Sequence, residues 1–239
     1  TVRGTAVAAS SKIAVPRIDF TPTDKVSRIP LAKGLLHRYP GSEVVVERGA
    51  TWVVPDAPFV FRQAQHWLSM SVKGGVAATG IGPYVLTYAR SQTADPAPST
   101  WTIERRLTDG SSPKDTEWAY CLASEIAWKY SFGEPLMFSA DGFARRVQAS
   151  TLTAALSLPT LEIPPAALAL VYMDSTWAGL GVTQLSAQVL GFNVAFHTGL
   201  KPLKIADARA DLDFSTYVLD PSAVGLDVDL VLLVAGQYD

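Results

Sequence analysis

The stretch Glu117-Trp-Ala-Tyr-Cys-Leu-Ala-Ser-Glu-Ile-Ala-Trp-Lys-Tyr-Ser131 determines the predicted fold of this 239-residue chain. Large side chains alternate with small or polar ones, with the single exception of Ser124, and a period of two is typical of a β-strand. The large side chains, our predicted core residues, are Trp118, Tyr120, Leu122, Ile126, Trp128 and Tyr130. A helical period would separate Trp128 and Tyr130 from the rest, so a strand is favoured. It is far longer than the ~5–6 residues common in globular proteins.

The strand is followed by a turn and a returning strand. Phe132-Gly-Glu-Pro135 has the composition of a tight turn, and the segment Leu136–Val147 is again rich in apolar residues. We therefore expect a long hairpin over about 117–148.

A weaker version of the same pattern occurs about sixty-five residues later. Leu185–His197 reads as a strand, and Gly199-Leu-Lys-Pro202 resembles the first turn. These features predict a second, related hairpin over about 183–213, which would be an internal duplication. Chance similarity between two short blocks is the competing explanation.

Further strands are expected outside the two hairpins. Residues 43–54 are rich in β-branched side chains, and the segments 84–90 and 100–107 flank a Pro-rich loop. In the segment Gly225–Gly236, apolar residues alternate with aspartates, which is typical of a half-buried strand.

One helix is predicted, over about 57–73. Asp56 stands before it as a candidate N-cap, and proline is tolerated in a first helical turn. Apolar residues recur at helical spacing and put Trp67 and Leu68 on the buried face.

The first forty-two residues are predicted to form an extended arm, separate from a β domain over 43–239. Four prolines oppose a helix or a central strand there: Pro16, Pro22, Pro30 and Pro40. A disordered leader is one interpretation. An arm that lies on another surface, such as a neighbouring subunit, better explains its many apolar residues.

Composition excludes several function classes. The chain carries 20 Lys+Arg and 22 Asp+Glu, so it has no basic excess for binding nucleic acid through phosphates. Hydrophobic residues make up 48% and charged residues only 18%, which suits a packed core but leaves little charge for a monomer's surface. A single cysteine, Cys121, rules out a disulfide framework and a multi-cysteine zinc site.

No motif indicates catalysis. The chain lacks a Gly-x-Ser-x-Gly elbow, a Walker motif and zinc-ligand spacing, so we predict no enzyme and no cofactor. Asp207, Asp211 and Asp213 form an acidic cluster without the glycine and terminal glutamate of an EF-hand loop. A solvated acidic face is favoured there over a cation site. The sequence has no run of 18 or more apolar residues, so no membrane-spanning helix is predicted.

The layout as a whole resembles the tail tube (major tail) protein of long-tailed phages. The order and spacing of five segments carry the resemblance: Gly4–Ala8, Leu68–Gly75, Thr100–Glu104, Tyr120–Gln148 and Leu185–Gly199. It implies a β-sandwich subunit with one flanking helix, whose long hairpins join those of neighbouring subunits into a large β-barrel. Rings of subunits would stack into a tube through which DNA is ejected into the host cell.

The resemblance also implies partners and a location. The ring would contain six copies, or three copies of a pseudo-sixfold arrangement. Tape measure, tail terminator and distal tail proteins would contact the tube, and DNA would pass through it transiently. The protein would be assembled in the host cytoplasm and reside in the virion tail. The family has no catalytic residues to carry over.

Alternation then predicts which side chains line the channel, because those opposite the core face would point into the lumen. The lumen candidates are Glu117, Glu125, Lys129, Ser131, Ser139, Asp141, Gln184, Ser186, Gln188, Asp227 and Asp229. An acidic or neutral lining repels phosphate weakly and keeps the DNA from adhering.

Two other functions remain open at the level of sequence. One is a related ring or tube component, such as a distal tail or neck protein or the tube of an injection machine. The other is a non-catalytic β-sandwich that binds carbohydrate or protein and stays monomeric.

Overall fold

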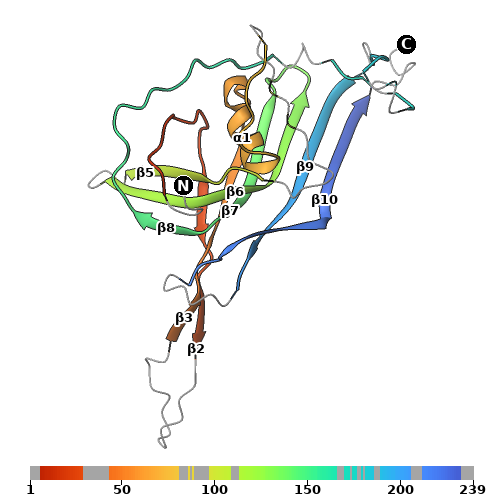
Figure 1. The fold of residues 1–239 in the computed structure, drawn as a ribbon. Coiled ribbons are helices and arrows are strands. Elements are labelled where there is room, and N and C mark those ends of the chain that lie inside the picture. Colours follow the sequence, from red (N-terminus) through yellow and green to blue (C-terminus); the bar gives the residue numbers. More distant parts are fainter. Residues whose placement is uncertain are drawn as a thin grey trace, which may run out of the picture.

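The computed structural model describes residues 6–28, 43–80, 86, 88, 97–108, 113–165, 170–172, 174–176, 179, 181–185, 189–205 and 212–232. The fold is mainly β, as predicted, and the described residues form one large antiparallel sheet, a two-stranded ribbon and one short α-helix (Figure 1). The elements are β1 (Asp19–Pro22), β2 (Lys25–Arg28), β3 (Glu43–Glu47), β4 (Ala50–Pro58), the 3-10 turn η1 (Phe61–Gln63), α1 (Ala64–Ser71), β5 (Trp101–Thr108), β6 (Pro113–Ser131), β7 (Met137–Ala144), β8 (Arg146–Ala149), β9 (Val189–Leu203) and β10 (Thr216–Leu232).

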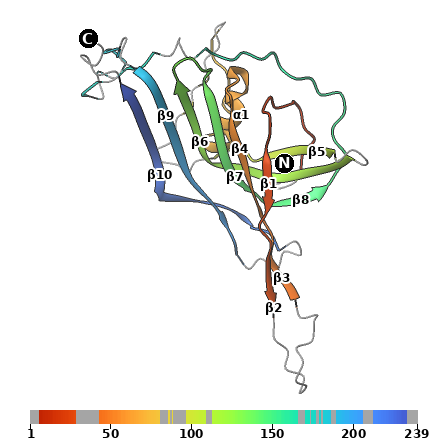
Figure 2. The same cartoon turned by 180° about the vertical axis from the view of Figure 1, so that it is seen from behind.

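The long predicted strand is β6, and it organises the sheet. Strand order is β1-β4-β7-β6-β9-β10, and β5 and β8 also pair with β6. The first part of β6 lies between β5 and β8, and its second part between β7 and β9. In Figures 1 and 2, β5, β8 and the first part of β6 run across the picture, whereas β7, β9 and β10 run from top to bottom. β6 therefore bends between these two groups of strands.

Two irregularities in β6 correct the predicted single row of large residues. Tyr120 has a left-handed backbone (φ 59°) where the register with β5 shifts, and a second shift lies between Ala123 and Glu125. Each extra residue in a bulge moves the following side chains to the other face. Consequently Tyr120 and Leu122 lie apart from the other predicted core residues.

The main core lies between the sheet and α1. Trp118 and Ile126 belong to it, with half-buried Trp128 and Leu68 packed against it. Trp67 is 3% exposed and lies 5.1 Å, ring to ring, from Phe138 of β7. The neighbouring Tyr130 is also buried, and its ring lies 5.4 Å from that of Phe192 in β9.

A second, smaller core joins Tyr120 and Leu122 to Phe143, Leu200 and Phe214. The buried Thr198 hydroxyl stabilises the second bulge, because it lies 3.0 Å from the Ala123 carbonyl oxygen and 2.9 Å from that of Ser124. One hydroxyl thereby provides a donor where the regular strand pairing is interrupted.

The helix is shorter than predicted. The expected N-cap Asp56 and the first two residues of the predicted helix belong to β4, and only residues 64–71 of the predicted span are α-helical. The register between β4 and β7 shifts from Val54 to Ala57, so the strand accommodates Pro55 at a bulge, where proline is tolerated.

The second hairpin is also different from the one predicted over 183–213. β9 continues through Gly199 and Pro202 without turning, and its partner is β10. Gly199 has φ 69° where the register with β10 shifts, so its left-handed backbone serves a bulge and not a turn. The strand predicted at 100–107 is β5, whereas that at 84–90 falls mostly outside the described residues.

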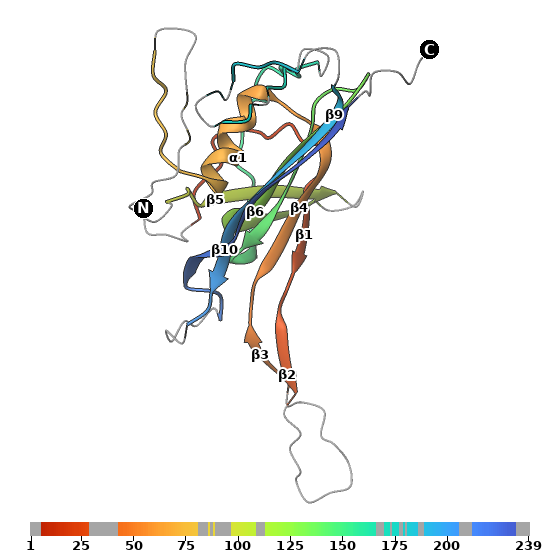
Figure 3. The same cartoon turned by 90° about the vertical axis from the view of Figure 1, so that its right-hand side faces the viewer.

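Residues 6–28, the described part of the predicted N-terminal arm, are not separate from the β domain. β1 pairs with β4 in the main sheet, and β2 pairs with β3 in a narrow ribbon that projects from the body (Figure 3). Phe20 stacks on Trp118 with ring centres 4.1 Å apart. The described part of the predicted arm therefore lies on its own subunit.

Gly142 tests the packing at the centre of the sheet. A Cβ there would lie 2.0 Å from the Leu122 carbonyl oxygen and 2.6 Å from the Trp52 ring. We expect Gly142→Ala to lower the unfolding free energy by about 3 kcal/mol, as overpacked sites do. The matched control is Gly225→Ala, whose Cβ would meet only the His197 ring at 3.7 Å. Urea unfolding of both variants measures the difference, and equal midpoints would contradict the packing.

Candidate assembly surface

Seven of the predicted lumen residues lie on one face of the sheet. They share the face opposite the main core: Glu125, Lys129, Ser131, Ser139, Asp141, Asp227 and Asp229. Cross-strand register brings them together, since Asp141 faces Glu125 across β7 and β6. We call this surface the polar face. That it lines a channel stays a prediction.

The remaining four lumen candidates are not on the polar face. Glu117 is buried at 8% exposure between β5 and β8, where its carboxylate accepts hydrogen bonds from Gln148 and Ser150, so its predicted position is wrong. Gln184 is exposed in a loop and forms a bridge with Tyr172. Ser186 and Gln188 lie outside the described residues.

The alternation of β9 also adds His197 to the polar face, a residue not among the predicted lumen candidates. Its Nδ1 lies 3.1 Å from Glu125 Oε2 in β6, and its Nε2 lies 2.9 Å from Asp227 Oδ2 in β10. The hydrogen bond with Asp227, followed by the charge of Glu125, raises the pKa of His197 against the opposing effect of burial. Asn193, two pairs along β9, shares this face. In the sequence, small or polar residues alternate at 191, 193, 195 and 197, and this pattern indicates that they share one face of the strand.

Asp141, on β7, lies in the same cluster of charged side chains as His197. Burial raises its pKa first and the negative charge of Glu125 adds to the rise, while His197 opposes it. The polar face is thus acidic, with one imidazole placed among three carboxylates.

β10 forms one edge of the sheet. Within the described part of the chain it pairs only with β9 and lies at the margin of the molecule (Figures 1 and 2). Its face opposite the polar face is apolar and matched across the two strands. We call this the apolar strip: Phe192, Val194 and Phe196 of β9 lie opposite Leu230, Val228 and Leu226 of β10. Leu226 is 61% and Val228 51% exposed, so the strip extends the core outward to an uncovered edge.

The predicted acidic cluster separates into different environments. Asp207 and Asp211 lie outside the described residues. Asp213 is buried, and its carboxylate lies 3.6 Å from Nε of the equally buried Arg145, whose guanidinium stacks over the Tyr120 ring at 4.3 Å. Asp213 therefore forms an ion pair within the second core and is not a solvated side chain.

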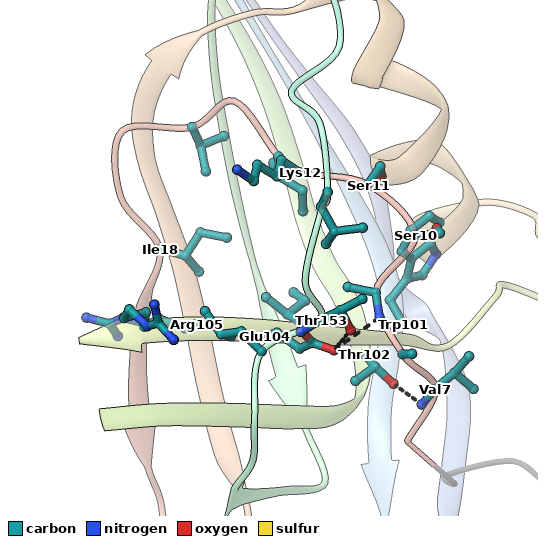
Figure 4. A pocket seen from close by; sticks show the side chains of 18 of the residues that line it. Val7, Ser10, Ser11, Lys12, Ile18, Trp101, Thr102, Glu104, Arg105 and Thr153 are labelled. Carbon is teal, nitrogen blue, oxygen red and sulfur yellow. Dashed lines mark hydrogen bonds between the residues drawn. The ribbon is translucent and has the colours of Figure 1, made fainter. Parts of the chain in front are cut away.

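A cavity of about 930 Å³ lies beside β5. Figure 4 shows the N-terminal segment and Thr153 meeting at Glu104 and Thr102 on its wall. The Glu104 carboxylate accepts hydrogen bonds from Ala9 N and from the amide and hydroxyl of Thr153. Burial works to raise the pKa of Glu104, but these hydrogen bonds outweigh it and lower the pKa. This carboxylate ties two segments to β5.

The thiol of Cys121 lies away from solvent, and potential metal-ligating side chains are dispersed in the described part of the chain. Cys121 is fully buried, and burial raises the pKa of its thiol. Among the residues that the structure describes, no group of three His, Cys, Asp or Glu side chains is arranged to hold a metal ion. No helix in that part of the chain is long and apolar enough to cross a membrane.

The chain matches no protein-family model and no curated protein sequence.

The Arg145–Asp213 pair yields a direct test of the second core. Asp213→Asn removes the charge of the carboxylate while keeping the side-chain size, and so removes the Arg145–Asp213 ion pair from the second core. We expect a loss of about 3 kcal/mol in unfolding free energy. Asp229→Asn, on an exposed site, should change it by less than about 0.5 kcal/mol. Chemical denaturation compares them, and similar stability of both variants would refute the role of the pair.

Proposed function

We propose that this chain is a structural protein that assembles with copies of itself into stacked rings, forming the tail tube of a long-tailed phage. The tube would conduct DNA during ejection. One observation carries the proposal: β10 is a 17-residue strand at the edge of the sheet, with an apolar strip on one face and an acidic surface on the other.

An edge strand of this length needs a partner. Its outer N–H and C=O groups form a template for another strand, and soluble monomers usually protect such edges with charge, proline or short length. Here the exposed side chains on the apolar strip are Leu226 and Val228. A second copy that pairs along β10 would satisfy the backbone and cover both residues.

The geometry of the two edges favours a ring over a closed dimer. β10 ends the strand order on one side, and β1 with β4 ends it on the other. Two different edges that meet in successive copies make a heterologous contact, which closes into a ring when the rotation between copies allows it. Closure removes both edges at once.

The polar face suits the lining of such a ring. Ring symmetry would repeat Glu125, Asp141, Asp227 and Asp229 in each subunit, so the wall would be acidic along its length. Each phosphate that a protein neutralises adds to its affinity for DNA. A wall with little positive charge would let DNA pass without binding to it.

The β2–β3 ribbon is a second candidate contact. A two-stranded ribbon is marginal by itself, and this one exposes Val26, Val44 and Val46 at 45–49%. An ion pair between Lys204 and Glu47 fastens β3 to the segment after β9. The ribbon projects beyond the sheet (Figure 3), where it would contact a neighbouring ring.

Val228→Lys tests the proposal. A lysine on the apolar strip puts a charge at the centre of the contact that β10 would make. We expect the unchanged chain to form hollow tubes in negative-stain micrographs, and the variant to need at least a ~10-fold higher protein concentration, which corresponds to 1.4 kcal/mol per contact.

The control is Leu158→Lys, an exposed apolar site (48%) outside the sheet. It should assemble like the unchanged chain, and circular dichroism should show that both variants are folded. A chain that remains monomeric at every concentration would overturn the proposal and favour a binding β-sandwich. Single capped rings without tubes would favour a related ring component.

A further inference from the structure

His197 occupies a position that only its protonated form satisfies. One ring nitrogen faces Glu125 at 3.1 Å and the other faces Asp227 at 2.9 Å. A neutral imidazole carries one N–H, so its second nitrogen would present a lone pair to a carboxylate. The imidazolium donates to both carboxylates. The geometry is therefore that of a cation between two anions.

The bridge reaches across the sheet to its edge. Asp141 in β7, Glu125 in β6 and His197 in β9 lie in one cross-strand row, and Gly225 of β10 faces the histidine. Asp227 is the next residue of β10 on the polar face. On β4, the residue opposite Asp141 is the uncharged Val53.

The other charged groups near this row are few. Lys129 of β6 and Asp229 of β10 lie on the same face, two register pairs along from Glu125 and His197. Among the residues that the structure describes, neither forms an ion pair with the row, and His197 is the cation in direct contact with its carboxylates. Without the proton on His197, three carboxylates would face one another uncompensated.

β10, the strand at the edge of the sheet, is the strand whose position can change when His197 loses its proton. Among the residues that the structure describes, only β9 pairs with β10 in this region, and the register between them shifts between Leu219 and Val224, just before Gly225. The Asp227–His197 contact is thus a side-chain tie between the edge strand and the interior of the sheet. β6 lies between two partners and is fixed without it.

We propose that the protonated His197 holds β10 in position for pairing with a second copy, so that self-assembly weakens when this histidine loses its proton. The inference rests on the proposed function, since it names a regulation of the same edge. It requires no ligand or metal.

The pH window follows from the shift in His197. Its pKa is raised above the ordinary value of 6.5, so the tie is fully present below 6.5 and is lost as the pH rises through the raised value. Assembly should therefore be strongest in mildly acidic to neutral solution and weaker in alkaline solution. Because the pair is partly exposed, salt should reduce the effect.

The first experiment measures the critical concentration for assembly by sedimentation of the full chain between pH 6 and 9. We expect a rise of about two- to fivefold for the unchanged chain, the size of one partly exposed ion pair. His197→Gln should show the alkaline value at every pH. The control His66→Gln alters a histidine on α1, on the other side of the sheet, and should follow the unchanged chain. A pH dependence retained in His197→Gln would overturn the inference.

The second experiment separates this inference from the proposed function. An NMR titration of the dilute chain follows the His197 ring directly, whether or not tubes form. We expect a midpoint above 6.5 that falls in Asp227→Asn, because that carboxylate is the largest cause of the shift. A midpoint at or below 6.5, or one that is unchanged in Asp227→Asn, would overturn the inference. Failure of the unchanged chain to assemble at any pH would count against the proposed function alone.

Discussion

The double-sided pairing of β6 is the constraint on which the structure depends. One strand of 19 residues pairs with β5, β7, β8 and β9, and it does so by changing neighbours part way along its length. A regular strand would keep one set of side chains on one face throughout. The bulges at Tyr120 and near Ser124 break that rule and let β6 contribute to two cores on opposite faces.

This arrangement also determines which parts of the sheet are left open. Because the main core, α1 and the N-terminal segment gather over β4, β6 and β7, the corresponding face of β9 and β10 carries the apolar strip without an equivalent cover in the described structure. The second core occupies only one end of the opposite face, where Phe214 and Leu200 meet β6. The rest of that face is polar. The sheet that builds the core thus ends at β10, an edge strand with one apolar and one acidic face. This edge is the basis of the proposed assembly.

Sequence periodicity predicted β6, β7 and the second half of β10, and with them most of the polar face, because alternation in these strands is regular between bulges. It did not predict β1 and β2, which lie in the segment expected to be an arm. It failed where single residues change the backbone. Tyr120 and Leu122 were assigned to the wrong face of the sheet, because a bulge leaves almost no trace in composition. Only Ser124, the exception in the alternation, indicated one of the two bulges in β6. Pro55 and Pro58 resembled a helix start but belong to β4. Gly199 resembled a turn because glycine serves turns and bulges alike. The bridge from His197 to Glu125 joins residues far apart in sequence, and only strand register brings them together.

Amide hydrogen exchange tests the central claim most directly, because it compares the two sides of the sheet in the same molecule. The amides of β6 should be protected at every protein concentration, since both edges of the strand are paired. Those β10 amides that point away from β9 should exchange rapidly in dilute solution and become protected as the concentration rises. Equal, concentration-independent protection of β6 and β10 would show that the edge is already satisfied within one chain, and it would contradict this account.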